Sequence, residues 1–176
     1  MRYTKLTYMQ KLSALKTITD ILFYLSFIPV IFGIPFLIVF LAAPDMVPFD
    51  VSFTDENMLK ATNGEKALFI LLIFICYLFY VYALYVFREI LGLFKQKIFF
   101  NDRISAGFNL IGKLIINGYL TYIVGYFVLA LITINDIQIR IDFDLLYALG
   151  AGYFFIVLGS VFKMAKQIKE ENELTV

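Results

Sequence analysis

The chain offers few side chains that could carry acid–base, nucleophilic or metal chemistry. It has no histidine, no tryptophan and a single cysteine, Cys76, which lies inside an apolar run. A catalytic base would therefore have to be a carboxylate, a lysine or a tyrosine. With one thiol and no imidazole, a chain cannot build an internal disulfide or a zinc site of the Cys/His type. We find no phosphate-binding loop, dinucleotide fingerprint or nucleophile elbow. We therefore expect a protein that is not an enzyme and has no metal or cofactor.

Tyrosines and one asparagine form a first group of residues that could bind a ligand. Tyr122 and Tyr126 lie four residues apart, Asn117 precedes them, and Tyr80 belongs to an earlier tyrosine-rich stretch. Phenols and an amide that meet between apolar helices could line a semi-polar pocket for an isoprenoid, a quinone or a lipid headgroup. Alternatively, they form hydrogen bonds between helices and anchor them at the membrane interface.

Charged residues in the stretches 88–103 and 163–176 form a second group. Glu170 follows Lys166 by four residues, and Glu173 follows Lys169 by four. The order lysine then glutamate is the weaker one in an isolated helix, which favours pairing with another loop or a partner protein. A solvated helix end is the alternative. The residues expected to dock a partner are Lys95, Lys97, Asn101, Arg103, Lys166, Lys169, Glu170, Glu171, Glu173, Leu174 and Thr175.

Four long apolar runs must position these residues. Hydrophobic residues make up 61% of the 176-residue chain and charged residues 16%, against about 45–50% and about 25% in soluble domains. The runs cover 21–43, 67–87, 114–134 and 143–162, and each can cross a hydrocarbon layer roughly 30 Å thick as a helix. We predict an all-α integral membrane protein, one four-helix domain over 1–176 with a charged tail over 163–176. Asn101 or Asp102 is expected to cap the third helix.

The distribution of lysine and arginine predicts the orientation of the helices. Twelve of the 15 basic residues precede the first run, lie between the second and third, or follow the fourth. The other two loops contain only Lys60, Lys66 and Arg140. Basic residues stay on the cytoplasmic side of a membrane, so both termini and the middle loop are expected there. The net charge of +1 gives no basic field that would indicate direct binding of nucleic acid.

The two outer loops show period-two alternation of apolar residues. In "MVPFDVSF" these are residues 47, 49, 51 and 53, and in "DIQIRIDF" residues 137, 139, 141 and 143. Such alternation is typical of half-buried strands. We therefore expect a small two-stranded β-sheet formed by the outer loops. An extended loop that rests on the membrane interface is the alternative.

Small residues recur at helical spacing in the third and fourth runs. Gly118 and Gly125 lie seven residues apart, and Ala148, Gly152 and Gly159 share one face of the last helix. Small side chains let helices approach closely in a membrane, where no hydrophobic effect drives their association. The pattern favours packing within one chain, and a homodimer face is the alternative.

Two stretches resemble a known family. The tail "IKEENELTV" after "VFKMAKQ", and the loop "FREILGLFKQKIFFNDRISAGFNLIGKLI", look like those of a bacterial family of small four-helix membrane proteins, catalogued as domain of unknown function 2975. Residues 169–176 match the family's closing pattern, and Phe99 or Phe100, Asn101 and Arg103 match its middle loop. The resemblance implies a multi-pass protein of the bacterial cytoplasmic membrane. It also suggests a neighbouring helix-turn-helix regulator.

These observations lead to one prediction of function and two alternatives. We expect a small, non-enzymatic membrane protein that docks or regulates a cytoplasmic partner, such as a helix-turn-helix regulator. A lipid- or small-apolar-ligand-binding or transport-accessory protein that uses the tyrosine-lined gap is the first alternative, and a membrane enzyme acting on lipid is the second. The expected partners are the lipid bilayer, the cytoplasmic protein and, if the small residues form a dimer face, a second copy of the chain.

Overall fold

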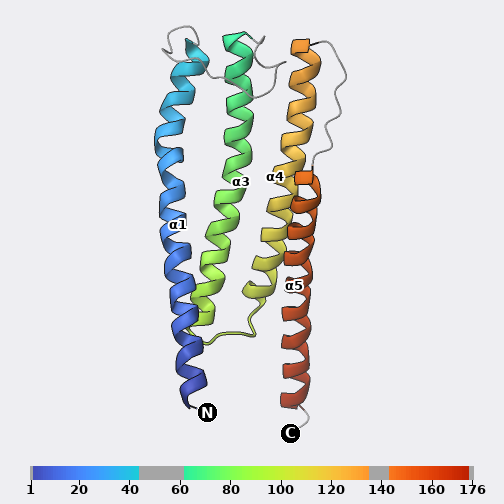
Figure 1. Ribbon diagram of the computed structural model, residues 1–176. Coiled ribbons are helices and arrows are strands. Elements are labelled where there is room, and N and C mark those ends of the chain that lie inside the picture. The colour runs from blue at the N-terminus through green and yellow to red at the C-terminus, as the bar shows by residue number, and fades with distance from the viewer. Residues whose placement is uncertain (1, 44–61, 135–142, 175–176) are drawn as a thin grey trace.

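Four long helices make up the regular structure of the described chain. The computed structural model describes residues 2–43, 62–134 and 143–174. Its helices are α1 (Arg2–Ala42), α3 (Asn63–Lys95), α4 (Asp102–Ile134) and α5 (Phe143–Leu174). Each is long and apolar enough to cross a membrane, as predicted. They lie side by side in chain order, with both termini and the α3–α4 connection at one end, here called the basic end (Figure 1). The opposite end is called the distal end.

The expected two-stranded sheet falls almost entirely outside the described residues. It would involve residues 47–53 and 137–143, of which the structure describes only Phe143. This residue is the first of α5 and not the last of a strand. Within the three described ranges the structure contains no strand. The sheet therefore stays a prediction.

Local hydrogen bonds explain where α3 and α4 begin. At the distal end, Glu65 N–H donates to the Thr62 hydroxyl at 3.4 Å, and Thr62 N–H donates to the Glu65 carboxylate at 2.7 Å. This reciprocal pair is a capping box, which satisfies N–H groups that have no partner within the helix. At the basic end, Arg103 N–H donates to the Asn101 side-chain oxygen at 2.9 Å. Of the two residues predicted to cap this helix, Asn101 and Asp102, the structure shows Asn101 in that role.

The turn after α3 has an unusual residue at its centre. Ile98 N–H donates to the Leu93 carbonyl and Lys97 N–H to the Phe94 carbonyl, both at 3.0 Å. These are the two bonds of a Schellman motif, whose central position is usually glycine because it requires a positive φ. Here Lys97 occupies it with a φ of 62°.

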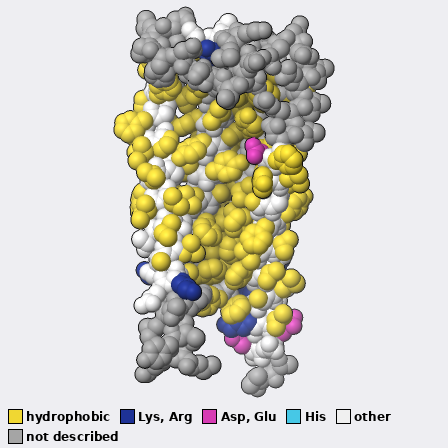
Figure 2. All heavy atoms as spheres, in the orientation of Figure 1, with side chains coloured by type: hydrophobic (Ala, Val, Ile, Leu, Met, Phe, Trp, Pro, Cys, Tyr) yellow, Lys and Arg dark blue, Asp and Glu magenta, His cyan; other side chains and the backbone are white. Residues whose placement is uncertain are grey.

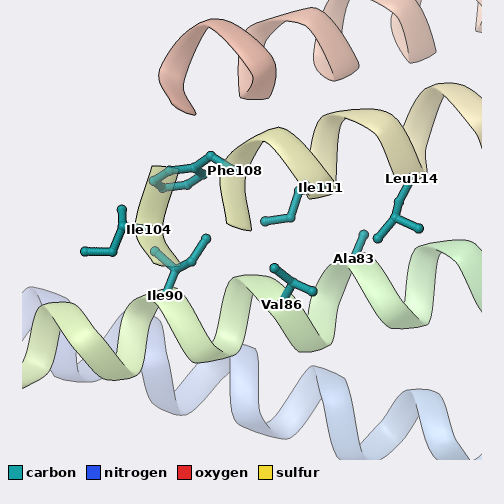
Figure 3. Packing of buried hydrophobic residues seen from close by; sticks show 7 residues of the cluster. All are labelled: Ala83, Val86, Ile90, Ile104, Phe108, Ile111 and Leu114. Carbon is teal, nitrogen blue, oxygen red and sulfur yellow. The ribbon is translucent and has the colours of Figure 1, made fainter. Parts of the chain in front are cut away.

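The main core lies between α3 and α4 in the half of the molecule near the basic end. Ala83, Val86 and Ile90 of α3 point toward Ile104, Phe108, Ile111 and Leu114 of α4 (Figure 3). Phenylalanines extend this core to α5: the Phe108 ring centroid lies 5.4 Å from that of Phe162 and 6.1 Å from that of Phe155. The distal half has a smaller cluster of Phe69, Tyr126 and Ala130.

Small residues allow α4 to approach both of its neighbours. A Cβ atom on Gly112 would lie 2.3 Å from the Gly152 carbonyl oxygen, and one on Gly159 would lie 2.8 Å from the Ser105 carbonyl oxygen. The Ser105 hydroxyl donates to the Gly159 carbonyl at 2.8 Å. On the other side of α4, Gly118 meets Phe79 and Gly125 meets Leu72. The glycines identified in the sequence thus contact helices of their own chain, and Ala148 is buried. The homodimer stays a prediction.

Helix α5 is displaced along its axis toward the basic end (Figure 1). Gly112 of α4 faces Gly152 of α5, and the two helices run in opposite directions. Phe143 lies nine residues before Gly152, so it lies level with the residue nine positions after Gly112, which is Thr121. Gly118 faces Phe79, so Thr121 in turn lies level with Cys76. The first residue of α5 is therefore level with the middle of the apolar run 67–87. By the same count its last twelve residues, 163–174, extend beyond the start of α4, roughly 18 Å at 1.5 Å per residue.

The surface of the molecule matches this arrangement. Hydrophobic side chains cover the band between the two ends, while lysines and carboxylates gather at the lower end of α5 (Figure 2). Large apolar residues are exposed on all four helices, as expected where lipid covers them. The described chain is consistent with a multi-pass membrane protein.

Candidate functional site

The α3–α4 connection and the end of α5 meet at the basic end. We call this site the platform and define it as residues 96–103 together with 163–174. Lys166 Nζ donates to the Asp102 carboxylate at 2.6 Å and lies 3.4 Å from Glu170. Lys166 lies after the apolar run 143–162. Its hydrogen bond to Asp102 raises its pKa above the usual value, burial lowers the pKa by a smaller amount, and Glu170 adds to the rise. The lysine thus links the connection to the tail.

An aromatic contact and an open groove complete the platform. Lys169 Nζ lies 5.3 Å from the ring centroid of Phe100, in cation–π geometry. It also pairs with Glu173 at 3.5 Å. A groove of about 640 Å³ runs beside these residues, lined by Phe100, Ala165, Ile168, Lys169, Asn172 and Glu173. The platform therefore combines an apolar floor with an ion pair at its edge.

The other residues predicted for docking lie around the platform. Lys95 ends α3, Lys97 forms the centre of the turn, and Asn101 caps α4. Arg103 and Glu171 are exposed, and the side chain of Leu174 is 88% exposed. Thr175 lies outside the described residues. Asp102 and Phe100, which connect the two segments, were not among the predicted docking residues, because their contacts lie more than sixty residues away in sequence.

The tyrosines and the asparagine that were predicted to form a pocket differ in how much of each residue is exposed. Tyr126 is buried and its ring centroid lies 6.2 Å from that of Tyr122. Tyr80 is 42% exposed and Asn117 is exposed. None of the four lines the groove of the platform. A ligand pocket among them stays a prediction.

A polar cluster that the sequence did not indicate joins α1 to α3. Arg88 Nε donates to the Asp20 carboxylate at 2.5 Å, and its Nη2 donates to the Tyr24 hydroxyl at 3.1 Å. The guanidinium also lies over the rings of Phe23 and Tyr24. Further along, the Tyr77 hydroxyl donates to the Ser26 carbonyl at 2.8 Å. Asp20 directly precedes the apolar run 21–43 and Arg88 directly follows the run 67–87, so the pair joins α1 and α3 at the boundary of their apolar segments.

The chemistry available at the platform is that of recognition. Its charged groups are lysines, one arginine and carboxylates, and among them Lys166 and Lys169 are paired with Asp102, Glu170 and Glu173. Among the residues that the structure describes, no three histidine, cysteine, aspartate or glutamate side chains form a group that could hold a metal ion. The arrangement suits a surface that binds another molecule through apolar contacts and paired charges.

Comparisons with known proteins complete the description. Neither a curated protein nor a solved structure matches the chain. Residues 7–176 match the profile of the family described as "Protein of unknown function (DUF2975)". The match covers nearly the whole chain and agrees with the resemblance in the tail and the middle loop. The chain therefore belongs to the DUF2975 family.

Proposed function

We propose that this chain is a non-enzymatic protein of the bacterial cytoplasmic membrane that docks and regulates a cytoplasmic protein at its platform. Both termini and the platform then face the cytoplasm, as the excess of basic residues at this end favours. The family resemblance suggests a helix-turn-helix regulator as a partner. Contact with nucleic acid belongs to that partner, since the platform carries charges of both signs.

The extension of α5 past α4 is the observation that carries this proposal. Twelve residues that no longer pack on α4 still form a helix and present large apolar side chains. Met164 is 54% and Ile168 58% exposed, and residues four apart lie on one face of a helix. Exposed apolar residues that are gathered on one surface and rimmed by charge mark interaction sites. A partner helix laid along this face would cover them.

The pairing with the α3–α4 connection supports a preformed site. Lys166 and Lys169 hold the tail against Asp102 and Phe100. A surface that is ordered before binding loses less conformational entropy when the partner arrives. The platform is thus suited to reversible docking of a folded partner.

Cross-linking in native membranes tests the proposal. We would compare the full chain with one that ends at Gln167 and with an Ile168→Ser variant, and identify the cross-linked proteins. The matched control is Ile132→Ser, since Ile132 is 67% exposed near the distal end. We expect one cytoplasmic protein to be cross-linked to the full chain and to the Ile132→Ser control, but not to the truncated chain or to Ile168→Ser. An unchanged set of cross-linked proteins in the truncated chain would contradict docking at the platform.

A further inference from the structure

A second groove, which shares Gln96 and Arg103 with the edge of the platform, lies between α3 and α4 near the basic end. It encloses about 470 Å³, and its floor includes Val86, Ile90 and Leu110. The groove is hollow because small residues occupy its walls. A Cβ on Gly107 would lie 2.9 Å from Ile90 Cδ1, so this glycine brings the helices together, and Gly92 and Ala106 add no bulk above the floor.

This groove opens away from α5. Arg103, Ala106 and Leu110 line it at intervals of three and four residues, which places them on one face of α4. The residues of α4 that meet α5 are Ser105 and Gly112, which lie on a different face. The opening therefore faces outward, where lipid surrounds a membrane helix.

Cationic groups from α4 and from α1 lie at the outer part of the groove. Arg103 of α4 and Gln96 line it directly. From α1, Lys16 Nζ lies 3.9 Å from the position that a Cβ atom on Gly92 would occupy, and 3.7 Å from the Asp20 carboxylate, which also pairs with Arg88. The groove thus has an ammonium near Gly92 and a guanidinium in its lining. Together they can hold a phosphate by charge-assisted hydrogen bonds.

Deeper in the groove the chemistry changes. Glu89 accepts a hydrogen bond from the Tyr85 hydroxyl at 2.8 Å, and Tyr82 follows further in. The apolar run of α3 ends at residue 87, just before Arg88. The groove therefore passes from the polar segment near Gln96 into the apolar segment near Tyr82.

We propose that this groove binds an anionic phospholipid from the leaflet at the basic end, with its phosphate between Lys16 and Arg103 and one acyl chain along the floor. A cation beside a lipid headgroup favours negative charge, and the apolar floor favours a hydrocarbon chain. A water-soluble phosphate would leave the floor uncovered, and a plain hydrocarbon would leave the cations unused. Glu89 opposes a second negative charge deeper in the groove, so a single phosphate at the rim fits best. This proposal does not depend on docking at the platform.

Native mass spectrometry of the detergent-solubilised full chain tests the proposal. We would add phosphatidylglycerol or phosphatidylcholine with identical acyl chains and compare the bound fractions. The wild-type chain should prefer phosphatidylglycerol. Arg103→Ala should reduce that preference about fivefold, because one cation near anionic lipid contributes ~1 kcal/mol. The matched control is Lys163→Ala, which removes an exposed cation of α5 that lines neither groove, and it should leave the preference unchanged.

A second pair of variants tests, independently of charge, whether the apolar floor of the groove holds an acyl chain. Ala106→Leu fills the groove and should lower the binding of both lipids, whereas Ala151→Leu changes an exposed alanine of α5 that lines neither groove and should change nothing. Equal binding of the two lipids by the wild-type chain, or equal effects of Arg103→Ala and Lys163→Ala, would overturn the proposal. Release of the lipid by millimolar inorganic phosphate would overturn it as well, since the acyl chain would then contribute nothing.

Discussion

The two halves of α4 are packed differently, although both lie within one continuous helix. Near the basic end, α4 lies between α3 and α5 and contributes Ile104, Phe108 and Ile111 to the main core. Near the distal end its described partner is α3 and the cluster contains only Phe69, Tyr126 and Ala130. The displacement of α5 explains the difference, because α5 begins level with Thr121. We infer that the half next to the platform provides most of the packing energy.

The largest expected effect comes from truncating the central phenylalanine of the basic half. Phe108→Ala should lower the free energy of unfolding by about 3 kcal/mol, because the neighbouring rings on α3 and α5 cannot all collapse into the space. Denaturation in detergent, followed by the loss of helical circular dichroism, measures it. Phe69→Ala in the distal half should lower it by less, since fewer helices surround that side chain and the site can collapse more fully. Equal losses would show that both halves are packed equally well.

Glycine substitutions sharpen the comparison at the helix crossings. Gly112→Ala places a methyl group against the Gly152 carbonyl oxygen, which is backbone and cannot rotate away, so we expect a loss of about 1–3 kcal/mol in the same assay. Gly125→Ala in the distal half meets the end of the Leu72 side chain, which can change rotamer, so its effect should be smaller. Gly150→Ala is the control, since a Cβ there meets nothing within 4 Å. A larger loss from Gly125→Ala would reverse the comparison.

The contact between the tail and the α3–α4 connection should have a smaller effect that is local. Asp102→Ala removes the partner of Lys166, and the pair is partly exposed, with Asp102 at 78%. Exposed pairs stabilise weakly, so global unfolding should hardly change. Amide hydrogen exchange in residues 163–174 should become about two- to fivefold faster. Gln167→Ala, an exposed position on the same tail, serves as the control. Unchanged exchange after Asp102→Ala would show that the platform does not depend on this bond.

Sequence alone predicted the number and type of the helices, because apolar runs of about twenty residues have few other structures available in lipid. It also narrowed the cap of α4 to Asn101 or Asp102, because a cap is a local feature, and the structure shows that it is Asn101. It did not predict the displacement of α5, since four runs of similar length suggest four helices at the same depth. The contacts Lys166–Asp102 and Arg88–Asp20 join residues 64 and 68 positions apart. No local pattern reveals such pairs, so the assembly of the platform required the structure.

The smallest predicted change is at the turn that carries the platform. Lys97 has a φ of 62°, a conformation that costs an L-residue roughly 1–2 kcal/mol. Lys97→Gly removes this cost. The glycine, however, gives the unfolded chain more conformational freedom, which destabilises the folded state by about 0.5–1 kcal/mol. The net result should be a gain of about 0.5 kcal/mol in unfolding free energy, measured in the same denaturation assay. Lys95→Gly, at the helical end of α3, should destabilise instead. If Lys97→Gly stabilises the chain yet weakens cross-linking to the partner, the lysine at this turn is retained for recognition at the basic end and not for stability.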